Sequence, residues 1–268
     1  MTTAALFTID DAFWSPRLET WRTITLPHVM QQCEDTGRLR NFDRAAGLLG
    51  DAFEGRVYDD SDVYKTLEGA AYAHALQPEA ALDLRVGDWV SRIAAAQRPD
   101  GYLHTWHQTH SDATPFEDVR TRHELYCAGH LLEAGLALHE ATGDDRLLGV
   151  AQRLVAHIRE RFGSGGRAEP TGHPELELAL LRLHAATGDD DALALARSLL
   201  EARGVTAERE SFGAYAQDHQ PVREQREATG HAVRAMYLDS ALAGVDSRTG
   251  ESAYSGALER IWHNIVDT

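Results

Sequence analysis

Residues 122–143 read RHELYCAGHLLEAGLALHEATG, and this stretch decides the fold. If it is helical, His123, Tyr126, Cys127 and His130 recur at i, i+3, i+4 and i+7 and share one face. The remainder is rich in leucine and alanine, which are residues of a buried helix. The pattern therefore predicts a core helix that carries two imidazoles and a thiol on one side.

Two later stretches begin in a similar way. Residues 172–193 read GHPELELALLRLHAATGDDDAL, and residues 228–244 read ATGHAVRAMYLDSALAG. In each of the three stretches a histidine lies in or beside the first turn of an apolar helix: His123, His173 and His231. Helical hairpins recur roughly every 50 to 60 residues with almost no strand pattern, which predicts an all-α protein.

Two all-α architectures fit such a repeat, an open α-solenoid and a closed α/α toroid. In a toroid the inner helices run parallel, so their N-termini meet at one rim. The polar loops before those helices are longer than solenoid turns usually are, and they hold most of the polar and aromatic residues: 38–60, 98–121, 163–173 and 204–228. We therefore expect a toroid with a polar pocket at one end.

Composition excludes several classes of function. The 268 residues carry a net charge of −16, which argues against binding to nucleic acid or to an anionic membrane. There is no signal-peptide pattern and no apolar run of about 18 residues. The two cysteines, Cys33 and Cys127, are too few for a disulfide framework, so we expect a cytoplasmic protein.

The three histidines at helix starts are the strongest candidates for a site. They either hydrogen-bond to a polyhydroxylated ligand or are cap and core residues that are satisfied locally. Their equivalent positions in three repeats favour the ligand. A second candidate is the i, i+4 pair His123 and Cys127, a spacing that can ligate zinc. Two ligands do not make a site, so we expect Cys127 to be a small apolar residue and the chain to bind no metal.

Carboxylates near the expected pocket are further candidates. Glycoside hydrolysis commonly uses one carboxylic acid and a second carboxylate on either side of the scissile bond. Spacing alone does not pair the acids of this region, which also suit the first turns of helices: Asp62, Glu124, Glu175, Glu177 and Asp218.

Together these motifs resemble a known family. The three helical stretches, preceded by DAFWSPR, DSDVYKTLEGAAY and QRPDGYLHT, are similar in order and spacing to the N-terminal half of the β-L-arabinofuranosidases. These enzymes form glycoside hydrolase family 127 (GH127), formerly a domain of unknown function. The resemblance covers nearly the whole chain.

The resemblance implies an (α/α)6 toroid and a retaining hydrolase that releases L-arabinofuranose. The family uses a zinc-bound cysteine as nucleophile and a glutamate as general acid/base. By the same resemblance His123, His173 and His231 line the sugar subsite. Neighbourhood alone adds three further sugar-binding candidates: Tyr64, Gln217 and His219.

One departure from the family pattern is large. The resemblance places the catalytic glutamate and the Glu/Cys zinc cluster beyond Thr268, and we count about nine of twelve helices. We therefore expect residues 1–268 to form a partial catalytic domain with no catalytic residue, zinc being bound only by the complete domain. The expected partners are a small arabinofuranoside and either a second copy or a complementing C-terminal chain.

Two other functions remain open at this stage. A different α/α-toroid sugar enzyme, such as an epimerase or an unsaturated-glycan hydrolase, would use histidines and carboxylates without metal. A non-catalytic helical scaffold that binds proteins would instead show an apolar concave surface with no affinity for sugar.

Overall fold

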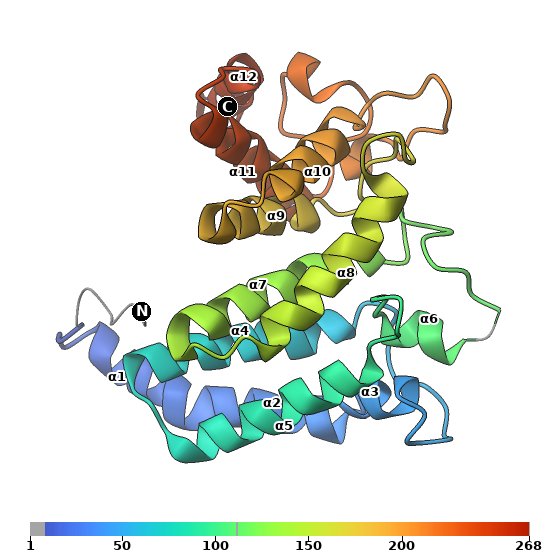
Figure 1. Cartoon of the computed structure of the whole chain (residues 1–268). Coiled ribbons are helices and arrows are strands. Elements are labelled where there is room, and N and C mark those ends of the chain that lie inside the picture. The colour runs from blue at the N-terminus through green and yellow to red at the C-terminus, as the bar shows by residue number, and fades with distance from the viewer. Residues whose placement is uncertain (1–8, 111, 268) are drawn as a thin grey trace. The chain divides into compact units, whose positions relative to one another are not determined.

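The computed structural model of the chain describes residues 9–110 and 112–267 (Figure 1). Within these residues the chain is helical, with a single β-bridge between Gly213 and Asp218 and no strand, so the all-α prediction is confirmed. None of the described helices is long and apolar enough to cross a membrane. The α-helices are α1 (Trp14–Thr20), α2 (Leu26–Asp35), α3 (Arg40–Ala45), α4 (Asp60–Leu76), α5 (Ala80–Ala96), α6 (Thr105–Thr109), α7 (Glu124–Thr142), α8 (Arg146–Phe162), α9 (Glu175–Thr187), α10 (Asp190–Glu201), α11 (Ala232–Thr249) and α12 (Ser255–Asp267).

The chain divides into two compact units. Unit 1 comprises Met1–Glu117 and His130–Leu154, and unit 2 comprises Asp118–Gly129 and Val155–Thr268. In unit 1, α2 packs against α4, and α5 packs against α3 and α4 (Figure 1). In unit 2, α9 packs against α10 and α11, and α11 packs against α12. Each unit thus has its own set of packed helices.

The N-terminal helical region is interrupted where the sequence predicts it. A helix over 16–35 with Pro27 inside should kink or break, because proline has no N–H to donate. In the structure a π-helical segment, η1 (Trp21–Thr25), joins α1 to α2, and the Leu26 N–H reaches back to the Trp21 carbonyl. The helical hydrogen bonds therefore span five residues instead of four just before Pro27, which is a common local adjustment at such a site.

The expected loop over 38–60 contains a helix, α3, so that part of the prediction is wrong. Polar side-chain contacts hold α3, and they give no apolar period that a sequence pattern could reveal. The buried Arg44 guanidinium donates to Asn41 Oδ1 at 2.7 Å and to both oxygens of Asp51, and it pairs with Glu54. Likewise, the expected loop over 98–121 contains α6.

The start of α4 is also corrected. We expect Ser61 or Asp62 to cap a helix that begins at Val63, but α4 begins at Asp60. Asp59 is its N-cap residue and makes no side-chain capping bond. Turn-like bonds from Ser61 N–H to Tyr58 O and from Asp62 N–H to Asp59 O start the helix earlier.

A buried arginine organises unit 2. The Arg203 side chain is fully buried and donates to the carbonyls of Ala216 and Thr171, the latter at 2.8 Å. Its guanidinium lies 3.6 Å from the buried Glu177 carboxylate on α9. Burial lowers the pKa of Arg203 and raises the pKa of Glu177.

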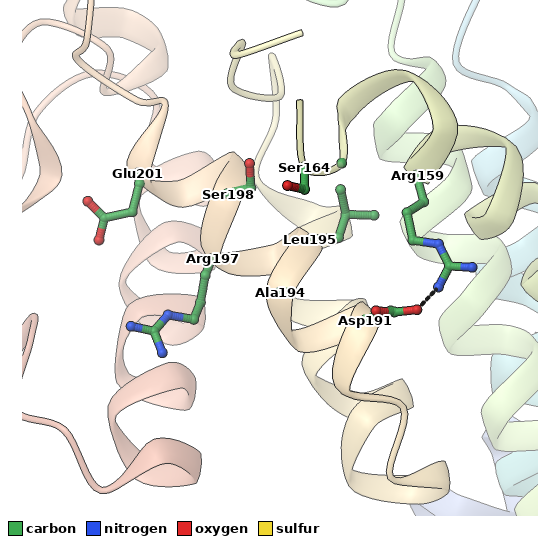
Figure 2. A pocket seen from close by; sticks show the side chains of 9 residues that line it. Arg159, Ser164, Asp191, Ala194, Leu195, Arg197, Ser198 and Glu201 are labelled. Atoms are coloured by element: carbon green, nitrogen blue, oxygen red, sulfur yellow. Dashed lines mark hydrogen bonds and ion pairs between the residues drawn. The ribbon is translucent and has the colours of Figure 1, made fainter. Parts of the chain in front are cut away.

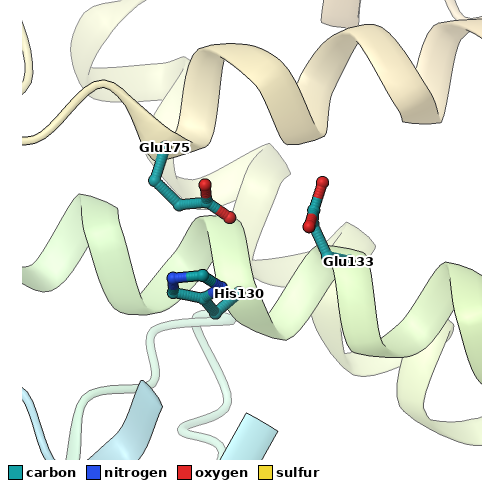
Figure 3. Close-up of side chains that lie close together, drawn as sticks. All are labelled: His130, Glu133 and Glu175. Carbon is teal, nitrogen blue, oxygen red and sulfur yellow. The ribbon is translucent and has the colours of Figure 1, made fainter. Parts of the chain in front are cut away.

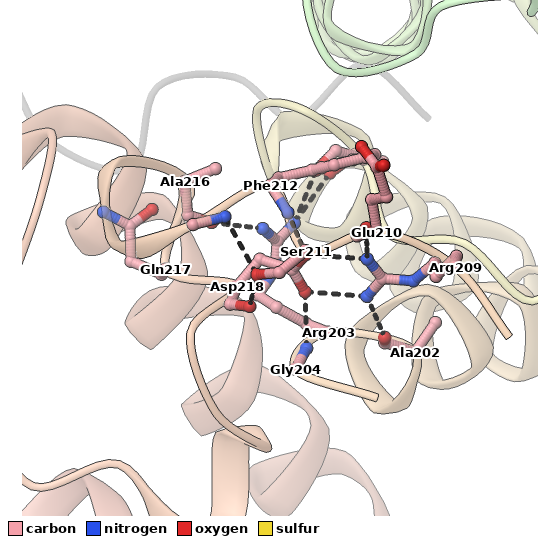
Figure 4. A network of polar contacts seen from close by, with 12 residues as sticks. Ala202, Arg203, Gly204, Arg209, Glu210, Ser211, Phe212, Ala216, Gln217 and Asp218 are labelled. Carbon is pink, nitrogen blue, oxygen red and sulfur yellow. Dashed lines mark hydrogen bonds and ion pairs between the residues drawn. The ribbon is translucent and has the colours of Figure 1, made fainter. Parts of the chain in front are cut away.

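The neighbouring Asp218 closes the loop between α10 and α11. Its carboxylate accepts two bonds from Arg209, each at 2.7 Å, and further bonds from the N–H groups of Gly204 and Phe212 (Figure 4). Charge-assisted bonds of this kind are among the strongest in proteins, so the loop is built around this carboxylate.

Replacing Arg203 should destabilise unit 2 strongly. Arg203→Met leaves Glu177 buried without its cation and two carbonyls without their donor, which costs on the order of 3–5 kcal/mol. Urea unfolding followed by circular dichroism measures the loss. Arg226→Met is the matched control, since Arg226 is exposed in the same unit. Equal midpoints for the two variants would contradict the structural role of Arg203.

In unit 1 a buried carboxylate joins α4 to α6. Asp60 accepts hydrogen bonds from the backbone N–H of Thr105, at 2.8 Å, and from the Thr105 hydroxyl. Burial raises the pKa of Asp60 to about 6, against the opposing effect of these bonds, and the nearby Asp59 raises it further.

This pKa predicts how stability depends on pH. The folded-state pKa lies above the unfolded value, so the unfolded chain loses its proton first as pH rises. The contribution of Asp60 is complete below about pH 4 and is lost between about pH 4 and 6, by about 3 kcal/mol in total. Over that interval the free energy of unfolding of the wild type should fall relative to that of Asp60→Asn. Parallel pH profiles from denaturant unfolding would rule this out.

Candidate functional site

A close contact between two backbone segments of unit 2 fixes the position of His173. The Gly172 N–H donates to the carbonyl of Val119 at 3.1 Å, which joins the loop before α9 to the segment before α7. A Cβ at Gly172 would lie 2.3 Å from the carbonyl oxygen of Arg120, so only glycine fits. Gly129 allows a similar close contact between α7 and the start of α9, because a Cβ there would lie 2.6 Å from Glu175 Cγ.

His173 is in contact with aromatic rings from two helices. The Tyr126 ring, in the first turn of α7, lies 4.6 Å from the His173 ring between centroids, and the Tyr237 ring of α11 lies at 5.3 Å. Tyr126 in turn meets the edge of His123 at 5.7 Å. Tyr126 therefore links two of the three predicted histidines.

The third histidine joins the same group. The His231 ring lies 6.2 Å from that of His173 and 5.4 Å from that of Tyr215. We call these six residues the ring cluster: His123, Tyr126, His173, Tyr215, His231 and Tyr237. All six belong to unit 2. The structure thus brings together the three histidines that the repeats mark.

Local hydrogen bonds define which nitrogen carries the proton in two of these imidazoles. His231 is the N-cap of α11, and its Nδ1 accepts from the backbone N–H of Arg234 at 3.3 Å, so its proton lies on Nε2. His123 Nδ1 donates to the carbonyl of Thr121 at 2.6 Å, which makes Nε2 the acceptor of the neutral ring. One imidazole donor and one acceptor suit a ligand rich in hydroxyl groups.

The three further sugar-binding candidates lie in different surroundings. The Gln217 Nε2 donates to the carbonyls of Thr229 at 2.8 Å and His231 at 3.2 Å, so this side chain supports the turn before α11. His219 is exposed in the same loop. Tyr64 is buried on α4 in unit 1, with its ring edge on Phe42 at 5.8 Å. Their role in sugar binding stays a prediction.

Three of the five candidate carboxylates are engaged by arginines. Glu177 faces Arg203, Asp218 is held by Arg209, and Asp62 accepts from Arg38 Nε at 2.8 Å. The structure gives these acids a part in folding, which spacing in the sequence did not reveal. Glu124 and Glu175 are buried in the first turns of α7 and α9.

Each unit contains buried residues of the types that bind metal ions. His130 and Glu133 are three positions apart on α7 in unit 1, and Glu175 begins α9 in unit 2; all three are buried (Figure 3). Burial lowers the pKa of His130 to about 3, helped by the charge of Lys65, so its imidazole is neutral, the form that binds metals. Imidazole and carboxylate groups of this kind are able to bind a metal ion.

A zinc-bound cysteine nucleophile does not fit the Cys33 environment. The Cys33 Sγ lies 3.7 Å from Thr66 Oγ1, and burial raises the pKa of the thiol, which favours the protonated form. Cys127 is buried on α7. We derive no catalytic step through either thiol.

A pocket of about 590 Å³ lies elsewhere in unit 2, between the end of α8 and α10 (Figure 2). Its charged residues have partners: Arg159 pairs with Asp191 at 2.6 Å, Arg197 with Glu251, and Glu201 with Arg223. The charges of this pocket are therefore largely neutralised. No member of the ring cluster lines the pocket.

Comparison with known proteins identifies the family. The model for the β-L-arabinofuranosidase GH127 catalytic domain matches residues 7–268. The chain belongs to this family. A non-reducing end β-L-arabinofuranosidase of Bifidobacterium longum subsp. longum is 38% identical over 253 residues, a match that covers 84% of this chain and 38% of that protein.

Solved GH127 structures share the fold. A GH127 β-L-arabinofuranosidase from Geobacillus stearothermophilus T6 superposes with a TM-score of 0.92 at 34% identity, over 97% of this chain and 45% of that one. A second GH127 β-arabinofuranosidase gives a TM-score of 0.90 at 38% identity, over 97% and 42%. The chain spans less than half the length of these relatives. The predicted (α/α)6 fold class and family are thereby confirmed.

The backbone contact at Gly172 gives a testable prediction. Gly172→Ala should push the His173 loop away from Val119 and destabilise unit 2 by about 1–3 kcal/mol, the usual cost of overpacking. Thermal unfolding measures it. Gly256→Ala is the control, because a Cβ there meets only the end of the Arg260 side chain at 3.5 Å and helix propensity favours alanine. A Gly172→Ala variant as stable as the wild type would refute the steric argument.

Proposed function

We propose that this chain provides the L-arabinofuranose-binding part of a β-L-arabinofuranosidase. The observation that carries the proposal is the ring cluster, in which histidines from three separate repeats lie together. Membership of the GH127 family supports the choice of sugar, because the relatives are β-L-arabinofuranosidases. A furanose presents several hydroxyl groups within a small volume, which suits imidazole donors and acceptors set at fixed positions.

Each part of the cluster has a distinct task in this proposal. His231 donates from Nε2 to a sugar hydroxyl, and His123 offers the opposite polarity through its Nε2. His173 lies between the two and binds a further hydroxyl. Tyrosine rings pack against the apolar C–H faces of the sugar and exclude water, as aromatic side chains commonly do in binding sites.

The ring cluster contains no carboxylate and no thiol, so we assign it binding and orientation of the sugar and no bond-breaking step. Retaining hydrolysis with release of L-arabinofuranose is the activity that we propose for the complete GH127 site, to which this chain contributes the sugar contacts. Gln217 acts in this scheme by holding the carbonyl of His231.

Removing the central imidazole tests the proposal. Methyl β-L-arabinofuranoside at about 100 times its dissociation constant should raise the stability of the wild type by about 2.7 kcal/mol, seen as a higher melting temperature. His173→Ala should lose this protection while remaining folded. His263→Ala, which removes an exposed histidine on α12, should keep it.

Two results would count against the proposed site. One is full protection of His173→Ala by the glycoside. The other is equal protection of the wild type by methyl α-D-glucopyranoside, because the cluster would then show no selectivity for the arabinofuranoside.

A further inference from the structure

Arg234 is a buried arginine beside the ring cluster that has no counter-charge among the described residues. The residue is only 8% exposed, and among the described residues no carboxylate lies within ion-pair distance of its guanidinium. Its Nε is buried and meets no acceptor in the described part of the chain. Burial lowers the pKa of Arg234, and only Tyr215 opposes this effect.

The other buried arginines in the described part of the chain are paired. Arg44 contacts Asp51 and Glu54, and Arg203 faces Glu177 and donates to two carbonyls. A buried charge left unpaired costs several kcal/mol, so an exception needs a reason. A ligand with a negative charge of its own supplies that reason, because it provides the counter-charge for Arg234.

The position of Arg234 supports this reading. Its guanidinium carbon lies 4.9 Å from the centroid of the Tyr215 ring, and Tyr215 meets the edge of His231. Arg234 also lies in the first turn of the 18-residue helix α11, where His231 is the N-cap. The positive end of the helix dipole adds to the guanidinium charge there, and both attract an anion.

We propose that Arg234 and the N-terminal end of α11 bind a carboxylate carried by the ligand beside the sugar that the ring cluster holds. This inference rests on the proposed function and adds to it the chemistry of the neighbouring group. The Tyr215 ring lies against the guanidinium and restrains it, which leaves N–H groups to bind the ligand. A carboxylate accepts two parallel bonds from these N–H groups, which a neutral group of the same shape does not match.

The net charge of the chain makes the test specific. At −16 the protein as a whole repels anions, so a preference for an anionic ligand must come from a local cation. The probes are 4-carboxyphenyl β-L-arabinofuranoside and its neutral isostere 4-carbamoylphenyl β-L-arabinofuranoside. Calorimetric titration gives the affinity of each probe for the wild type and the variants.

The wild type should bind the carboxyphenyl glycoside about tenfold or more tightly than the carbamoyl one. Arg234→Gln should abolish the preference and leave the carbamoyl affinity within about twofold. Arg234→Lys should keep only part of it, because an ammonium group cannot form the bidentate pair. Arg226→Gln removes an exposed charge of the same unit and should keep the full preference.

The outcomes separate this inference from the proposed function. Equal affinities of the two probes for the wild type, or a preference that survives in Arg234→Gln, overturns the carboxylate site while leaving the sugar site standing. A preference that depends on Arg234 in a His173→Ala background supports the carboxylate site even if sugar binding is lost. Failure of the wild type to bind either probe overturns both. Should Arg234→Gln not fold, a full preference in Arg234→Lys overturns the inference.

Discussion

The burial of Arg203 is the interaction on which the arrangement of unit 2 depends. Its guanidinium holds the carbonyl of Thr171, two residues before His173, and the carbonyl of Ala216, in the loop that leads to His231. It also faces Glu177 on α9. One side chain from the end of α10 therefore ties together the two loops that carry histidines of the ring cluster. The cost of burying its charge is repaid by these fixed contacts.

Polar groups in unit 2 differ in the neighbours that surround them. Asp218 and Gln217 use their side chains on backbone groups and on Arg209, which keeps the loop before α11 in one conformation. The histidine rings at the helix starts and the guanidinium of Arg234 lie against aromatic rings, while His231 also caps α11 and His123 also bonds to the Thr121 carbonyl. Rigid support behind adaptable polar groups is what a preorganised binding site needs.

Glycines allow the close backbone contacts that this arrangement requires. Gly172 lets the loop before α9 lie against the segment before α7, and Gly129 lets the start of α9 approach α7. The same positions are unremarkable in the sequence, where glycine reads simply as a loop or a weak point in a helix. Their meaning depends on which backbone they approach, and that is a property of the folded chain.

The sequence by itself determined the helices with a clear apolar period, their recurrence, the family and the three histidines at helix starts. These are local patterns, and the forces behind them act within a few turns of chain. It did not predict α3, because that helix is held by contacts of Arg44 with two carboxylates that lie outside the helix. Only the tertiary structure decided that Tyr126 links His123 to His173, that Glu177 and Asp218 serve the fold, and that no carboxylate among the described residues pairs with Arg234. Each of these depends on contacts between residues far apart in the chain, which no local pattern encodes.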